Sequence, residues 1–120
     1  MAHGGTSFEW TVGRKFQKMG YRVQRAYESV GIWDLLCLRK VYVMGKAYTE
    51  VLEVQVKGTP YEFTEQDKLD LKKHAEEIGA RAVYAYGKRL LSKTKLGKNN
   101  QPILNKHRTI FIEYLHNEQV

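Results

Sequence analysis

The stretch Val51-Leu52-Glu53-Val54-Gln55-Val56-Lys57-Gly58 decides which fold this chain can adopt. Apolar and polar residues alternate along it, which is typical of a β-strand that packs one face against a core. One face carries Leu52, Val54 and Val56, and the other carries Val51, Glu53, Gln55 and Lys57. Because Gly58-Thr59-Pro60 breaks the pattern, the sequence predicts a strand over residues 51–57 with three polar side chains on one face.

Helices are predicted on both sides of this strand. Over residues 8–19, apolar side chains recur every three or four positions, Thr6 or Ser7 precedes them as an N-cap, and a glycine follows. A second helix begins at Thr64 with an aspartate three residues on, as in a capping box, and ends at the glycine at position 79.

The remaining elements are strands over residues 21–26, 33–40, 81–86 and 109–114, a loop over 27–32 and a turn at 44–46. The element order is therefore α-β-β-β-α-β-loop-β. Consecutive strands form hairpins and strands joined through a helix pair in parallel, so we expect an α/β fold with a mixed central sheet of about five strands flanked by helices. A length of 120 residues suits a single domain, residues 1–120.

The composition is that of a folded domain, with 42% hydrophobic and 28% charged residues. No apolar run has the length of a membrane span, and the N-terminus lacks the layout of a signal peptide. We therefore expect a soluble, intracellular (cytoplasmic) protein with no membrane partner. The single cysteine, Cys37, excludes an intramolecular disulfide and a Cys-based zinc site, and its apolar surroundings favour a buried, inert thiol.

Basic residues are concentrated toward the C-terminal end of the chain. The formal net charge is +7, and residues 88–108 alone contain seven Lys or Arg residues and no acidic residue. This pattern favours a polyanion such as DNA as the partner, with a merely solvated basic loop as the alternative. We predict a long loop there, with Lys88, Arg89, Lys93, Lys95 and Lys98 as candidate DNA contacts.

One set of polar residues suits phosphodiester hydrolysis. If the second and third predicted strands are hairpin neighbours, Asp34 and Gln55 lie side by side at the sheet surface, and Glu9 reaches them from the first helix. The two carboxylates are hard oxygen ligands for Mg²⁺ or Mn²⁺, and the Gln55 amide oxygen and the Val56 carbonyl add neutral ones. Lys57 can then position the attacking water or offset charge on the phosphate. The alternative is that these are ordinary strand residues facing solvent.

Several segments in a fixed order carry a family resemblance. They are Phe8-Glu9, Gly20-Tyr21-Arg22-Val23-Gln24-Arg25, Ser29-Val30-Gly31-Ile32-Trp33-Asp34-Leu35-Leu36, Val54-Gln55-Val56-Lys57-Gly58, and Gln66 opening the helix that ends at Gly79. Over roughly residues 8–86, the chain resembles the archaeal-type Holliday junction resolvases of the restriction-endonuclease-like nuclease superfamily.

The resemblance implies a restriction-endonuclease-like fold and a homodimer that cuts two opposed strands of four-way junction DNA with Mg²⁺, or Mn²⁺ in its place. By position, it implies that Glu9 is the acid of the first helix, Asp34 the metal-binding aspartate and Lys57 the catalytic lysine. It also implies that Arg25 lies near the scissile phosphate and that Ser29 belongs to the loop before the aspartate.

The chain departs from the family pattern at three places. Gln55 stands where most members carry a carboxylate, which weakens the attraction for a divalent cation, and Glu53 on the same strand face is a candidate to compensate. Trp10 stands where resolvases usually carry a basic residue, and the loop over 27–33 is shorter than in many members. A glutamine at the position of Gln55 occurs in the Mrr-like branch of the superfamily. The alternatives are therefore an Mrr-like or repair nuclease acting on duplex DNA, and a non-catalytic DNA-binding relative.

Overall fold

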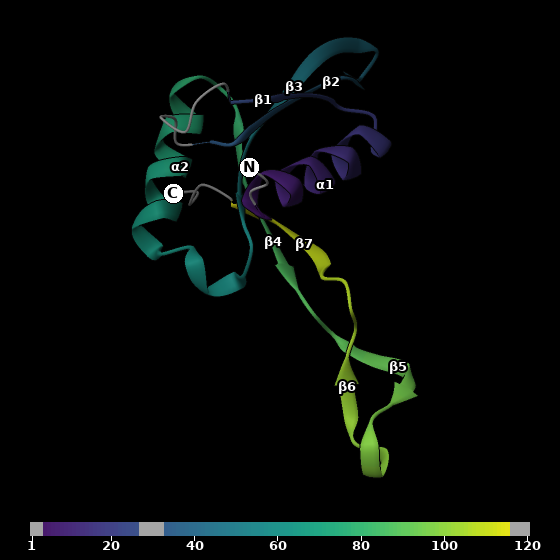
Figure 1. Ribbon diagram of the computed structural model, residues 1–120. Coiled ribbons are helices and arrows are strands. Elements are labelled where there is room, and N and C mark those ends of the chain that lie inside the picture. The colour runs from purple at the N-terminus through teal and green to yellow at the C-terminus, as the bar shows by residue number, and fades with distance from the viewer. Residues whose placement is uncertain (1–3, 27–32, 116–120) are drawn as a thin grey trace.

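The computed structural model describes residues 4–26 and 33–115, and its central feature is a mixed five-stranded sheet with the strand order β1-β2-β3-β4-β7 (Figure 1). The elements are α1 (Gly4–Lys18), β1 (Arg22–Arg25), β2 (Leu35–Val43), β3 (Lys46–Lys57), η1 (Pro60–Glu62), α2 (Glu65–Glu77), β4 (Arg81–Lys88), β5 (Leu91–Leu96), η2 (Lys98–Asn100), β6 (Pro102–Leu104) and β7 (Thr109–Leu115). Strands β3 and β4, which α2 connects, are parallel, and the other neighbours in this sheet are antiparallel. The predicted α/β class and mixed five-stranded sheet are confirmed.

The two helices cover opposite faces of the sheet (Figure 1). Helix α1 buries Val12 and Phe16 against the apolar face of β3, where Leu52 and Val54 are fully buried. Helix α2 buries Leu71 and Ala75 in a second cluster on the other face. The face of β3 that carries the polar residues is therefore the α2 face. No helix among the described residues is long and apolar enough to cross a lipid bilayer.

Both helices end two residues before the predicted glycines, and the start of α1 differs from the prediction. Gly20 has a φ of 98°, and the Tyr21 N–H donates to the Phe16 carbonyl at 3.1 Å, which closes the C-terminus of α1. Helix α1 begins at Gly4, so the predicted caps at positions 6 and 7 lie inside its first turn. The capping box of α2 is confirmed, because the Thr64 side chain accepts from the Asp67 N–H while the Asp67 carboxylate accepts from the Thr64 N–H.

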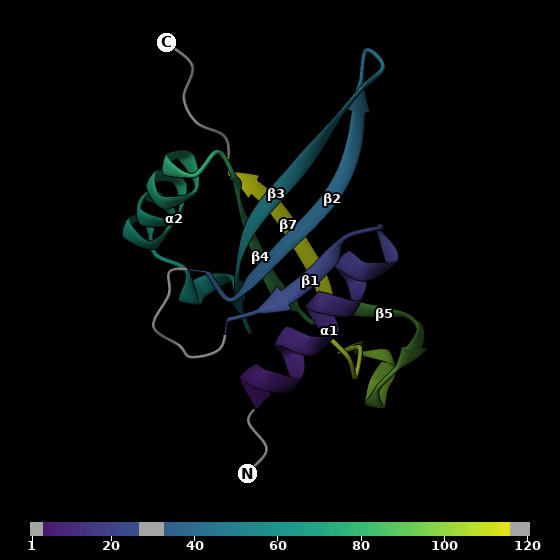
Figure 2. The ribbon, with the colours of Figure 1, turned by 90° about the horizontal axis from the view of Figure 1, so that it is seen from above.

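Strands β2 and β3 form a longer hairpin than predicted (Figure 2). Their pairing continues to Val43 and Lys46, and the turn between them has positive φ angles of 51° at Met44 and 81° at Gly45. The turn itself was predicted. The extra residues escaped prediction because the outer part of this hairpin is solvent-exposed and lacks a buried face, so no apolar alternation marks it.

The basic segment is not the predicted loop. Residues 88–108 include the end of β4 and a two-stranded sheet of β5 and β6, which we call the basic arm (residues 89–108) and which projects from the body of the molecule (Figure 1). Leu91 pairs with Leu104 and Leu96 with Pro102. Hydrogen bonds between β5 and β6 hold the arm, and few of its side chains are buried. Its apolar residues are exposed among lysines, so the sequence shows no apolar alternation from which strands could be predicted.

Candidate active site

Asp34 lies just before β2, where three strands meet. Its N–H donates to the Val54 carbonyl at 2.8 Å, and its carbonyl accepts from the Ala26 N–H at 2.9 Å. The β2–β3 ladder ends at the pair Leu35–Val54, so Asp34 and Gln55 are each the next residue beyond that last pair. Strands β2 and β3 are thus the hairpin neighbours that the sequence predicted.

The Asp34 carboxylate is partly withdrawn from water. Burial raises its pKa above the ordinary value, while a 2.7 Å hydrogen bond from the Val56 N–H to Oδ2 and the positive charge of Lys57 act in the lowering direction. Burial is the largest effect. Lys57 therefore lies within electrostatic reach of a carboxylate that ionises reluctantly.

Glu9 approaches the same place from α1. Its pKa is raised first by burial and then by repulsion from the Asp34 carboxylate, and the guanidinium of Arg25 opposes both effects. Nη2 of Arg25 lies 3.5 Å from Oε1 of Glu9. The structure thus brings together Glu9, Asp34 and Lys57, with Arg25 at their edge.

The Gln55 side chain carries a buried amide oxygen. Oε1 of Gln55 is buried and accepts no hydrogen bond from any residue that the structure describes. An unpaired buried acceptor costs about 1–3 kcal/mol, so a group that supplied a positive charge or a donor there would remove that cost. The Val56 carbonyl belongs to the next residue of the same strand.

The oxygen atoms of Glu9, Asp34 and Gln55 are hard donors, the kind that Mg²⁺ prefers. No group of three or more His, Cys, Asp or Glu side chains is arranged to hold a metal within residues 4–26 and 33–115. Mg²⁺ is commonly held by one or two carboxylates and keeps several waters. The carboxylates of Glu9 and Asp34 with the orphaned Oε1 of Gln55 are chemically compatible with that requirement.

Glu53 does not take the compensating role considered for it. Its side chain is fully buried on the α2 face, and Nδ1 of His74 lies 2.9 and 3.0 Å from its two carboxylate oxygens. Both carboxylate oxygens of Glu53 therefore contact His74 of α2. The sequence offered no sign of this pair, because Glu53 and His74 are 21 residues apart and their contact depends on how α2 packs.

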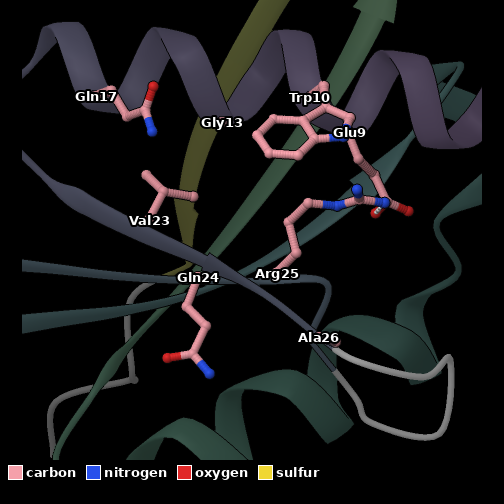
Figure 3. Close-up of a pocket in the computed structure, with 8 residues that line it drawn as sticks. All are labelled: Glu9, Trp10, Gly13, Gln17, Val23, Gln24, Arg25 and Ala26. Atoms are coloured by element: carbon pink, nitrogen blue, oxygen red, sulfur yellow. Dashed lines mark hydrogen bonds and ion pairs between the residues drawn. The ribbon is translucent and has the colours of Figure 1, made fainter.

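A cavity of about 500 Å³ opens between α1 and β1, and Glu9 is among the residues that line it (Figure 3). Trp10 and Arg25 are among its lining residues, and Cζ of Arg25 lies 5.0 Å from the centroid of the Trp10 ring. Sequence reasoning treated Trp10 only as a missing basic residue. The sequence did carry one signal for this cavity, namely a large aromatic residue next to Glu9 and one helical turn before Gly13.

The basic arm is joined to the active-site strand at its base. Nη1 of Arg108 donates to the Gly58 carbonyl at 2.9 Å, and its Cζ lies 4.3 Å from the centroid of the Phe8 ring. Gly58 directly follows Lys57, so the arm starts next to the candidate site. The proposed DNA contacts are all exposed on or beside the arm: Lys88, Arg89, Lys93, Lys95 and Lys98.

Three other residues were singled out in the sequence. Ser29 lies outside the described residues. The Gln66 amide is exposed and donates to Asp70 on the same helix at 2.8 Å, so it has the position of a surface residue. Cys37 is fully buried, and burial raises the pKa of its thiol to about 12, which agrees with the inert thiol expected.

Comparisons with known proteins add no assignment. No protein-family model matches the chain, and neither the curated proteins nor the solved structures yield a match.

Proposed function

We propose that this protein is a DNA endonuclease of the restriction-endonuclease-like fold that resolves four-way junctions by paired phosphodiester hydrolysis. The observation that supports the proposal is the electrostatic coupling of Asp34 to Glu9 on one side and to Lys57 on the other, with the buried amide oxygen of Gln55, unpartnered among the described residues, two residues before Lys57. Two carboxylates, a neutral oxygen and a lysine are the groups that metal-assisted hydrolysis of a phosphodiester needs.

In this proposal the residues have separate tasks. Mg²⁺, or Mn²⁺ in its place, would be held by Glu9, Asp34, Gln55 and the Val56 carbonyl, and would supply Lewis-acid activation of water and of the phosphate. The Lys57 ammonium orients the attacking water and offsets the charge that develops on the phosphate. Arg25 donates to a phosphate oxygen from the edge of the site, because its guanidinium already lies against Glu9.

The basic arm and a homodimer complete the proposal. Exposed lysines on an arm that begins beside Gly58 can follow one DNA arm away from the cleavage site. Two opposed strands need two active sites, and a two-fold dimer matches the two-fold symmetry of a junction.

A second candidate is an Mrr-like or repair nuclease of the same fold that cuts duplex DNA. Gln55 favours it, because an amide at this position weakens cation binding relative to a carboxylate and occurs in that branch. A non-catalytic DNA-binding relative follows from the same observation if the cation is not retained.

The test is incubation of the purified protein with a labelled four-way junction and with its component duplexes, in Mg²⁺, in Mn²⁺ and in EDTA. Paired nicks in the junction that require metal are expected, and Asp34→Ala should abolish them while junction binding survives. Cleavage of duplex and junction at equal rates would favour the second candidate. Tight junction binding without nicks in any metal would favour the non-catalytic relative.

A further inference from the structure

We propose that the cavity between α1 and β1 binds one unstacked nucleobase of the DNA, next to the cleavage site; this inference rests on the proposed function. The walls of the cavity include Glu9, Trp10, Gly13 and Gln17 from α1 and Val23 and Arg25 from β1 (Figure 3). Its volume of about 500 Å³ lies within the range of roughly 300–1,000 Å³ usual for small-molecule sites.

Trp10 has the properties of a stacking platform. It keeps 45% of its surface exposed, although it is a large apolar residue, and the Arg25 guanidinium lies over its ring at 5.0 Å. Sites for unstacked nucleotides combine aromatic rings on which bases stack with arginines that reinforce the contact. Because Arg25 already holds the indole, little side-chain entropy remains to be lost when a base binds.

Polar groups in the cavity match the edge of a base. Nε of Arg25 is buried and donates to nothing in the described part of the chain, so an acceptor on a base would satisfy it. The Gln17 amide points from α1 toward Val23 and offers both a donor and an acceptor (Figure 3). Gly13, between Trp10 and Gln17 on the same helix, adds no side chain that would fill the space.

Glu9 connects the cavity to the cleavage site. The residue lines the cavity, while its carboxylate pairs with Arg25 and repels Asp34. A base in the cavity would therefore belong to a nucleotide close to the cut phosphate. Since unstacking costs least at a branch point, a mismatch or a single-stranded segment, the cavity would select DNA in which that nucleotide is already loosened.

The experiment measures binding in EDTA, so that no cleavage intervenes, by fluorescence anisotropy. The probes are a labelled four-way junction and a series of the same junction with one abasic site at successive nucleotides around the branch. We expect one abasic position to weaken wild-type binding about 5- to 150-fold, the effect of losing one stacked base. Trp10→Ala should bind the intact junction as weakly as wild type binds the junction with that abasic site, and the abasic site should not weaken its binding further. Trp10→Phe should recover part of the lost affinity.

The matched control is Tyr42→Ala, which removes an exposed aromatic from the β2–β3 hairpin and should behave like wild type. The inference is overturned if no abasic position weakens wild-type binding, or if Trp10→Ala still discriminates against the abasic junction. Either result leaves junction cleavage intact as a function.

A wild-type protein that does not bind branched DNA would defeat the proposed function instead. The cavity is then tested alone in a Trp33→Phe variant, in which Trp10 is the only remaining tryptophan. Saturable quenching of its fluorescence by deoxyadenosine monophosphate would support a base-binding cavity, and unchanged fluorescence would refute it.

Discussion

The backbone N–H of Val56 donates a 2.7 Å hydrogen bond to Oδ2 of Asp34, so that β3 fixes a carboxylate that stands at the start of β2. The bond orients the carboxylate but does not compensate for its burial, since the pKa of Asp34 remains above its ordinary value. The folded structure thus makes the charged form of Asp34 less favourable than it is in water. Such a cost is common where a group serves chemistry.

Asp34→Asn should abolish cleavage and raise the stability of the protein near neutral pH. Asparagine keeps an oxygen for the Val56 N–H and removes the buried charge. Since the folded-state pKa of Asp34 is raised, ionisation destabilises the wild type fully above that pKa, and this penalty disappears as pH falls below the unfolded-state value. The gain in unfolding temperature should therefore shrink in acid. Asp70→Asn, on the exposed face of α2, should change the free energy of unfolding by less than about 0.5 kcal/mol at either pH.

The rate of cleavage should fall as pH is lowered, at pH values above the ordinary carboxyl values of 3.8 and 4.5. Glu9 and Asp34 must be ionised to hold a cation, and the pKa values of both are raised. Arg25→Gln should move the acid limb to higher pH, because Arg25 lowers the pKa of Glu9. Single-turnover rates against pH measure the shift, and Arg22→Gln on the same strand is the control. An unshifted acid limb in Arg25→Gln would contradict this reading of Glu9.

Gln55→Glu should bind Mg²⁺ at least about tenfold more tightly, because a third carboxylate joins Glu9 and Asp34. In EDTA the same variant should unfold at a lower temperature than wild type, since like charges are then uncompensated. Calorimetric titration and thermal unfolding with and without Mg²⁺ measure both effects. The control is Gln24→Glu, because the Gln24 side chain points away from α1 (Figure 3). This variant should show neither the tighter Mg²⁺ binding nor the lower unfolding temperature. Equal Mg²⁺ affinity in wild type and Gln55→Glu would argue against Gln55 as a ligand position.

His74→Ala should destabilise the protein by about 3 kcal/mol, because it leaves the fully buried Glu53 carboxylate without its partner. Denaturant unfolding gives this value directly, and His107→Ala, at an exposed position, should stay within about 0.5 kcal/mol of wild type. In the double variant Glu53→Leu with His74→Ala, part of the loss should return, since no buried carboxyl group is then left without its partner. A mild effect of His74→Ala would show that the pair is not needed for stability.

Neutralising Lys93 and Lys95 should weaken DNA binding and flatten its dependence on salt. Each lost phosphate contact lowers the slope of log affinity against log salt by about 0.9 on duplex arms. The single-turnover rate at saturating protein should change little, because the arm binds but does not react. The control is neutralisation of Lys72 and Lys73 on α2, away from the arm (Figure 1). An unchanged slope in the arm variant would remove the arm from the DNA interface.

Local patterns in the sequence predicted most of the main sheet and both helices. Alternation placed Leu52, Val54 and Val56 in the core, and the Thr64 capping box marked the start of α2. These signals are readable because they depend on neighbours within a few residues. The predicted meeting of Asp34 with Gln55 rested on the same basis, since a hairpin turn brings their strands together.

What escaped prediction depends on packing between distant elements. The Glu53–His74 pair and the cavity beside Trp10 exist only once α2 and α1 have docked on the sheet. The strands of the basic arm escaped for the opposite reason, because they bury almost nothing and so leave no apolar periodicity.

The basic arm is also an insertion whose two ends meet at one point of the main sheet. Lys88 and Thr109 are direct partners in the β4–β7 ladder, and within residues 4–26 and 33–115 the strands β5 and β6 pair with each other and with no strand of the main sheet. A segment of another length or charge between Arg89 and His107 can therefore replace the present one without changing the register of the main sheet, and the Arg108 contact with Gly58 is then kept. The charge carried by this projection can thereby change while the end of β3 beside Lys57 stays as it is.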